Sequence, residues 1–212
     1  MTRQKSCDPT VFVVDDDESV RDSLVAMVES MEFPVECFAS ADEFLRTFEA
    51  RRRGCLVLDV RMPGMSGVEL QERLVNDGVR LPVVMITGHG DIPTWVRTVR
   101  RGAVDFIEKP YRPRKLADAI RAAMDLDVRQ SLASSQAKDA EERLLQLTAH
   151  ERDVMSGILA GKLNKVVAEE LDISLRTVES RWASIREKLR VDSRVGLAQL
   201  VSRADQSSEA SR

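Results

Sequence analysis

The chain has 212 residues, a formal net charge of −3 and 43% hydrophobic residues, values typical of an ordinary globular protein with one or two domains. No stretch approaches the ~20 apolar residues of a membrane span, and the first residues lack the apolar core of a signal peptide. The 3 cysteines lie far apart, two of them in apolar segments. We therefore expect a cytoplasmic protein with reduced cysteines, no membrane association, and neither disulfides nor a cysteine metal site.

Charge is unevenly distributed along the chain. Residues 141–212 hold 12 basic and 12 acidic residues, so the −3 resides in residues 1–140. Within the C-terminal part, residues 174–194 carry a local net charge of +3. A basic run of this kind indicates a polyanionic partner, although weakly when taken alone.

Short apolar runs alternate with segments of helical spacing over residues 8–125. Continuous apolar runs predict strands that are buried on both faces, as in a parallel sheet. The expected strands are 11–14, 34–38, 55–58, 82–87 and 103–108. The expected helices are 18–31, 41–50, 67–76, one from 91 to 101, and one that starts near Arg112 or Pro113. This β-α alternation predicts an α/β domain with helices on both faces of its sheet.

Residues with useful chemistry stand at the ends of these strands: Asp15 and Asp16, Asp59, Thr87 and Lys109. Strand ends of a parallel sheet share one edge, so these side chains should meet there. Crowded carboxylates need a cation, and hard oxygen ligands suit Mg²⁺. A carboxylate beside such an ion can accept a phosphoryl group, whose developing charge a lysine and a hydroxyl stabilise. Alternatively, the five residues are unrelated helix caps and turn residues. That interpretation explains any one of them well, but it explains the whole set poorly.

Four segments around these residues together resemble the receiver domain of a two-component response regulator. They are Val-Asp-Asp-Asp at 14–17, Asp-Val-Arg-Met-Pro-Gly-Met-Ser-Gly at 59–67, Thr-Gly-His-Gly-Asp at 87–91 and Phe-Ile-Glu-Lys-Pro at 106–110. The resemblance covers about residues 8–125. It implies a flavodoxin-like, doubly wound sheet of five parallel strands in the order 2-1-3-4-5.

The resemblance also implies roles for the acidic residues. Asp59 would be the phosphoacceptor, which a sensor histidine kinase phosphorylates. Asp16 would bind Mg²⁺ directly and Asp15 mostly through water. Asp59 itself and the backbone carbonyl of Arg61 would complete the metal site.

Further roles follow for the other strand-end residues. Lys109 would pair with the phosphoryl oxygens, and Thr87 would bond one of them after phosphorylation. Phe106 fits the family's aromatic switch position and can also be a core residue. Movement of Thr87 would vacate space for Phe106, which would shift the face formed by helix 91–101, strand 103–108 and the last helix. The Lys109–Pro110 peptide bond is expected to be cis.

We also make predictions for three other residues near this site: Arg61, His89 and Trp95. Arg61 and His89 each lie two residues past a site residue, where they would flank an attacking water and tune the lifetime of the phosphoryl group. Two exposed loop residues are an equally good interpretation. Trp95, early in helix 91–101, is expected either to pack in the core or to anchor a dimer.

The segment 126–143 becomes polar but contains no Gly or Pro. A continuous helix and a flexible linker are both compatible with it. The second domain is expected at 144–203, where Thr148 and Glu151 form a capping-box pattern. Helices are predicted at about 148–160, 164–171, 175–190 and 193–202, which gives a small all-α domain. Residues 204–212 are expected to be a disordered tail.

The second domain resembles the LuxR-type helix-turn-helix domain. The matching segments are Leu-Thr-Ala-His-Glu-Arg at 147–152, Gly161, Asn-Lys-Val-Val-Ala at 164–168, Leu-Asp-Ile-Ser at 171–174 and Thr-Val-Glu-Ser-Arg at 177–181. Val167 replaces the more common Ile, and Arg181-Trp182 replaces the usual His-Arg pair. The resemblance implies that helix 175–190 is a recognition helix that enters the major groove of DNA.

Helical spacing separates a core face and a DNA face on this helix. The core face is the apolar stripe Val178, Trp182, Ile185 and Leu189. The predicted base-edge contacts are Arg176, Glu179, Ser180 and Ala183, of which only the arginine has the forked donors that suit guanine. Thr177 joins the predicted DNA-binding set, and the phosphate contacts are Lys165, Arg181, Arg186 and Lys188.

Together these features predict a transcriptional response regulator. Phosphorylation of Asp59 would promote homodimerisation and control binding to promoter DNA, with RNA polymerase as a further candidate partner. The alternative is a phosphorylation-dependent interaction module whose helical domain binds a protein instead of DNA. A phosphatase acting on external substrates is disfavoured, because neither a general base nor a substrate pocket is evident. We therefore expect no enzyme activity beyond the domain's own phosphoryl transfer and slow dephosphorylation.

Overall fold

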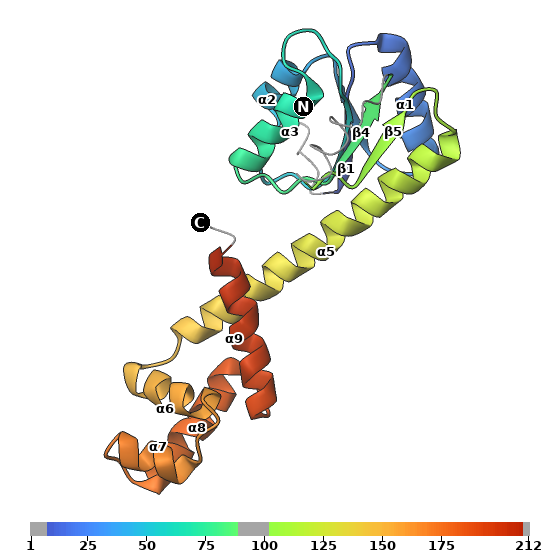
Figure 1. The fold of residues 1–212 in the computed structure, drawn as a ribbon. Helices are drawn as coiled ribbons and strands as arrows, with labels where there is room; N and C mark the ends of the chain where they lie inside the picture. The colour runs from blue at the N-terminus through green and yellow to red at the C-terminus, as the bar shows by residue number, and fades with distance from the viewer. Residues whose placement is uncertain (1–7, 89–101, 210–212) are drawn as a thin grey trace, which may run out of the picture. The chain divides into compact units, whose positions relative to one another are not determined.

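A computed structural model describes residues 8–88 and 102–209 of the chain (Figure 1). The chain divides into two compact units, residues 1–130 and residues 131–212. The helix predicted at 91–101, together with His89 and Trp95, lies outside the described residues.

The first unit is built on one sheet of five parallel strands in the order β2-β1-β3-β4-β5. The strands are β1 (Thr10–Val14), β2 (Val35–Phe38), β3 (Gly54–Asp59), β4 (Val83–Thr87) and β5 (Asp105–Glu108). All residues of β1, β3 and β4 are buried, which explains why these segments read as continuous apolar runs. The predicted doubly wound fold and its strand order are confirmed.

Helices cover both faces of this sheet (Figure 1). α1 (Glu18–Ser30) and the first part of α5 (Pro113–Leu145) pack on one face, and α2 (Ala41–Thr47) and α3 (Gly67–Asn76) pack on the other. The side chains of Asp17, Ser40 and Ser66 cap α1, α2 and α3. Asp17 and Ser40 come within three residues of the ends of β1 and β2, so α1 and α2 begin at the sheet edge where the predicted site lies.

α5 is a single helix of 33 residues, so the segment 126–143 is helical. Its last buried residue in the first unit is Asp127, which accepts a 2.9 Å bond from the Arg53 guanidinium. Residues 128–136 are exposed except for the half-buried Ser131, and burial resumes at Ala137.

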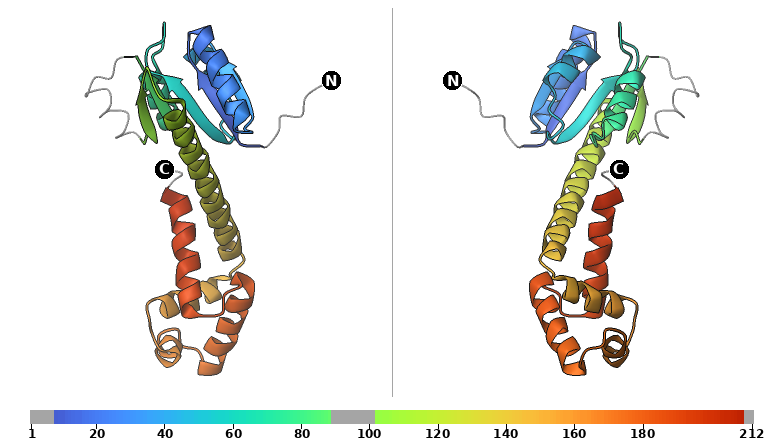
Figure 2. Two further views of the ribbon diagram at one scale, coloured as in Figure 1. Left: turned by 90° about the vertical axis from the view of Figure 1, so that its right-hand side faces the viewer. Right: turned by 90° about the vertical axis from the view of Figure 1, so that its left-hand side faces the viewer.

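The second unit contains α6 (Ala149–Leu159), α7 (Asn164–Glu170), α8 (Leu175–Leu189) and α9 (Arg194–Glu209). Their core includes Ala140 of α5, so the packed unit begins before the predicted boundary at 144. Figure 2 shows α9 beside the last turns of α5, and Ala204 is buried in the same core.

The predicted disordered tail is wrong for residues 204–209, because α9 continues to Glu209. No Gly or Pro interrupts the chain after Gly196, and burial of Ala204 stabilises the extra turns.

Candidate functional site

The Lys109 ammonium group joins two acids at the carboxyl edge of the sheet. Its Nζ donates to Asp59 Oδ1 at 2.8 Å and to Asp15 Oδ2 at 2.9 Å. Asp59 is only 6% exposed and Asp15 only 2% exposed. The three residues come from the ends of β3, β1 and β5, as the strand-end argument predicted. The structure therefore brings the predicted acceptor, one predicted metal ligand and the predicted cation into direct contact.

Backbone groups orient both carboxylates. The Arg61 N–H donates to Asp59 Oδ2 at 2.7 Å, and the Asp17 N–H donates to Asp15 Oδ1 at 3.0 Å. Each acid thus has one oxygen bonded to a main-chain donor two residues on and the other bonded to Lys109. One oxygen of each carboxylate is therefore held by the loop that follows its own strand.

The pKa values of Asp59 and Lys109 are both raised, but for different reasons. Burial raises the pKa of Asp59, and the Lys109 hydrogen bond opposes this rise without cancelling it. Burial alone would lower the pKa of Lys109, but the bonds to Asp59 and Asp15 outweigh it and raise the pKa. Lys109 is therefore held as a cation, whereas the charge on Asp59 is incompletely compensated.

The donor set of this edge fits a hard cation such as Mg²⁺. Asp15 and Asp59 already share one positive charge, and Mg²⁺ is typically held by one or two carboxylates with water completing its shell. The neighbouring Asp16 is exposed. Among residues 8–88 and 102–209, no three acidic, His or Cys side chains are already grouped to hold a metal. The predicted ligands therefore form a two-carboxylate site beside an exposed third acid.

The two predicted switch residues lie on adjacent strands next to the acids. Thr87 ends β4 with 1% exposure, and its carbonyl oxygen accepts a 2.7 Å bond from the Lys109 N–H. Phe106 of β5 is half-buried against the core cluster of the α2–α3 face. The Lys109–Pro110 peptide bond is cis, as expected from the family resemblance. The switch roles of Thr87 and Phe106 stay predictions.

Gly67, the first residue of α3, permits a close approach to the acceptor strand. A Cβ atom at this position would overlap the carbonyl oxygen of Asp59. The Gly67 N–H in turn donates to the Val60 carbonyl at 3.1 Å. A residue larger than glycine would push the backbone that carries the acceptor.

α8 of the second unit presents a polar face opposite its core face. Val178, Ile185 and Leu189 are buried, while the four predicted base-edge residues are exposed: Arg176, Glu179, Ser180 and Ala183. Thr177 is half-buried, and its hydroxyl lies 2.8 Å from the capping Ser174 hydroxyl. Its local role is therefore to begin the helix.

A network centred on Glu151 connects α6 to α8, and the sequence did not reveal it. Lys188 Nζ lies 2.8 and 2.7 Å from the two Glu151 carboxylate oxygens, and the Ser184 hydroxyl donates at 2.7 Å. The Thr148 N–H donates at 2.8 Å, which confirms the predicted capping box. Burial alone would raise the pKa of Glu151, but these donors, Lys188 first, lower it to about 2.

This network bears on one predicted DNA contact. The prediction that Lys188 binds a phosphate stays untested, but its ammonium group already has a buried partner inside the unit. Lys165 and Arg186 are exposed and Arg181 is half-buried. Lys165, Arg181 and Arg186 are thus better placed than Lys188 to contact a phosphate.

Comparison with known proteins agrees with both halves of this arrangement. The response regulator receiver domain family matches residues 11–121, and the luxR family of bacterial regulatory proteins matches residues 145–201. The chain belongs to the response regulators that pair a receiver domain with a LuxR-type DNA-binding domain.

Curated relatives match along nearly the whole chain. The response regulator protein TodT of Pseudomonas putida is 40% identical over 94% of this chain and 88% of its own length. The transcriptional regulatory protein FixJ of Rhizobium meliloti is 43% identical over 88% of this chain and 91% of its own.

Solved structures agree with the fold. The response regulator StyR matches with a TM-score of 0.81 and 42% identity, over 92% of this chain and 98% of that one. Full-length FixJ from B. japonicum matches with a TM-score of 0.56 and 37% identity, over 93% and 98%.

None of the helices in the described part of the chain combines the length and the apolar character that a bilayer span requires.

Proposed function

We propose that this protein is a phosphorylation-controlled transcription regulator in which Asp59 accepts a phosphoryl group from a sensor histidine kinase. The observation that carries this proposal is the Lys109 ammonium group, which bonds Asp59 Oδ1 at 2.8 Å and Asp15 Oδ2 at 2.9 Å. An acid held this way is oriented, desolvated and beside a cation, which is what acceptance of a phosphoryl group needs.

Each residue of the site has a part in the transfer. An Asp59 carboxylate oxygen forms the new bond to phosphorus, while the bond from phosphorus to the donor nitrogen breaks. Lys109 neutralises the charge on the phosphoryl oxygens, and the Arg61 N–H keeps the second carboxylate oxygen in place. Asp15, Asp16, Asp59 and the Arg61 carbonyl would hold Mg²⁺, which when bound supplies further charge neutralisation at the transferred group.

Phosphorylation would then change the switch face. The new group adds roughly −1.5 to −2 charges, which attract the Thr87 hydroxyl and open room for Phe106. The half-buried position of Phe106 supports this exchange, because the residue packs against the core without being fully enclosed. The result is a population shift between two packings of β5 and the elements beside it.

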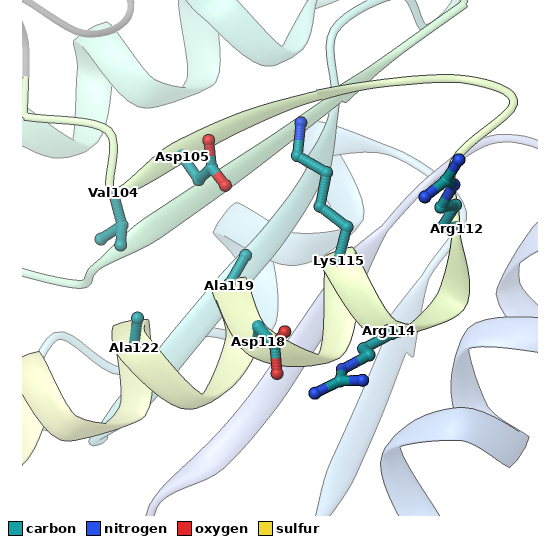
Figure 3. Close-up of a pocket in the computed structure, with 8 residues that line it drawn as sticks. All are labelled: Val104, Asp105, Arg112, Arg114, Lys115, Asp118, Ala119 and Ala122. Atoms are coloured by element: carbon teal, nitrogen blue, oxygen red, sulfur yellow. The ribbon is translucent and has the colours of Figure 1, made fainter.

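A groove on this face supports homodimerisation. It has a volume of about 470 Å³ between β5 and the start of α5 (Figure 3). Its lining carries both signs of charge: Arg112, Arg114 and Lys115 are basic, and Asp105 and Asp118 are acidic. A surface with both signs can pair with a second copy of itself, as a two-fold dimer requires. Two paired second units would then bind a two-fold promoter site through α8.

Phosphorylation of the intact chain with acetyl phosphate and Mg²⁺ tests the proposal. Intact mass should show one added phosphoryl group in the wild type and none in Asp59→Asn. A phosphoryl group that remains on Asp59→Asn would place the acceptor elsewhere and contradict the proposed site.

A further inference from the structure

Arg186 and Trp182 form a cation–π pair on α8. The guanidinium carbon lies over the indole ring, 5.9 Å from its centroid. Trp182 is half-buried against the core cluster of the second unit, whereas Arg186 is exposed. Within the part of the chain that the structure describes, this is the one ring contact, hydrogen bond or ion pair that engages the Arg186 side chain.

Two other cations of the second unit, Lys188 and Arg194, have partners inside it. Lys188 is bound to Glu151, and Arg194 donates to the Lys162 carbonyl and to Asn164. Both positive charges therefore serve contacts inside the unit. Arg186 forms no such ion pair among the described residues, and its guanidinium lies over the indole.

A contact with an aromatic ring leaves the N–H donors of a guanidinium group available. A guanidinium group packs on an aromatic ring through its flat face, and its N–H donors lie in the plane of that face. These donors suit the oxygens of a phosphate. Because the ring already limits the side-chain rotamers, less conformational entropy is lost when a phosphate binds.

Arg186 also lies on the correct side of the helix. It follows Glu179 by about two turns of 3.6 residues, so it projects from the same face as the predicted base-edge residues. Its position extends that face toward the C-terminal half of α8. A residue there would meet the DNA backbone if the first turns meet the bases.

We infer that Trp182 is a positioning residue that holds the Arg186 guanidinium for a DNA phosphate. The inference deepens the proposed function, since it rests on DNA binding by α8. The half-buried indole thus has two roles, one side packing in the core and the other supporting a charged group.

The test is a double-mutant cycle on the intact protein, with Trp182→Leu, Arg186→Gln and the double variant. The probe is a duplex that the wild type selects from a random-sequence library, and binding is measured over a series of KCl concentrations. Trp182→Phe retains a ring face, and Arg203→Gln is a matched control because Arg203 is an exposed arginine on α9.

Arg186→Gln should reduce the slope of log affinity against log salt by about 1. Trp182→Leu should weaken binding about two- to tenfold, and Trp182→Phe should weaken it less. In the Arg186→Gln background, Trp182→Leu should cost nothing further. Arg203→Gln should leave the slope unchanged.

Two results would overturn the inference. One is an equal loss from Trp182→Leu in both backgrounds, which would make Trp182 a core residue only. The other is an unchanged salt slope in Arg186→Gln. If Trp182→Leu does not fold, Trp182→Phe takes its place in the cycle with a smaller expected coupling. A wild type that selects no duplex would instead refute the proposed function itself.

Discussion

Both units contain a lysine held by a buried carboxylate, and the two arrangements differ in their balance of charge. The Lys109 ammonium group forms ion pairs with both Asp59 and Asp15. Lys188 directs its ammonium group to Glu151 alone, which also accepts bonds from other donors. Thus one lysine side chain pairs with two acids in the first unit, whereas several side chains donate to one acid in the second.

The pKa values of Asp59 and Glu151 differ accordingly. Burial raises the pKa of Asp59 despite its bond to Lys109, whereas the donors around Glu151 lower its pKa to about 2. An acid that is incompletely compensated suits a site that will receive a further group and a further cation. A fully compensated acid suits a fixed connection between helices. The same residue types therefore give a reactive site in one unit and a structural one in the other.

The largest effect is expected from Lys109→Met. Without the ammonium group, Asp15 and Asp59 repel each other and the transferred phosphoryl group loses its cation. The rate of phosphorylation by acetyl phosphate should fall about 100-fold or more, as for other losses of a transition-state charge partner. The rate is measured by intact mass over time, with Lys138→Met, an exposed lysine of α5, as the control. A fall of less than threefold would remove Lys109 from the chemistry.

The next largest effect is expected from Glu151→Gln. The pKa of Glu151 is lowered from 4.5 to about 2, so its charged form stabilises the second unit by at most roughly 3 kcal/mol at neutral pH. That stabilisation is fully present above the unfolded pKa of 4.5 and is lost as the pH falls toward 2. Glu151→Gln should lack this contribution at every pH.

Urea denaturation followed by Trp182 fluorescence measures this prediction. A Trp95→Phe background makes Trp182 the single tryptophan, since the chain has 2. If the wild type and Glu151→Gln lost the same amount of stability between pH 5 and 3, Glu151 would not be the group that titrates.

A smaller effect is expected from Gly67→Ala in the first unit. The new methyl group would overlap the Asp59 carbonyl oxygen, so the unit should lose about 1–3 kcal/mol of stability as the backbone shifts. Gly88→Ala is the matched control, because no atom of residues 8–88 or 102–209 lies within 4 Å of a Cβ atom there. Equal stability of the two variants in denaturant titration would contradict the close approach.

The smallest effect separates two lysines of the second unit. Lys165→Gln should lower the salt slope of DNA binding by about 1, because Lys165 is exposed and predicted to bind a phosphate. Lys188→Gln should leave the slope unchanged and destabilise the unit by about 1–3 kcal/mol, because it removes the partner of Glu151. The opposite pattern would restore Lys188 as a phosphate contact.

The sequence predicted the features that depend on local pattern. Continuous apolar runs defined the buried strands, and the strand-end argument brought Asp59 and Lys109 together although 50 positions separate them. The capping box of Thr148 and Glu151 was also predicted, because its residues are three apart.

Features that depend on contacts between distant helices were missed. The Lys188 bond to Glu151 spans 37 positions, and the Arg53 bond to Asp127 spans 74. No period in the sequence connects such residues, so Lys188 was assigned to DNA from its charge alone. The extension of α9 was missed for the same reason, since burial of Ala204 depends on the packed core of the second unit and is not visible in a polar tail.

Binding of phosphorylated and unphosphorylated protein to one selected duplex tests the central claim most directly. The wild type and Asp59→Asn are each measured with and without acetyl phosphate and Mg²⁺. The account predicts tighter binding by the phosphorylated wild type and no change in Asp59→Asn. Equal affinity of the wild type in both states would contradict the claim that Asp59 controls the DNA-binding unit.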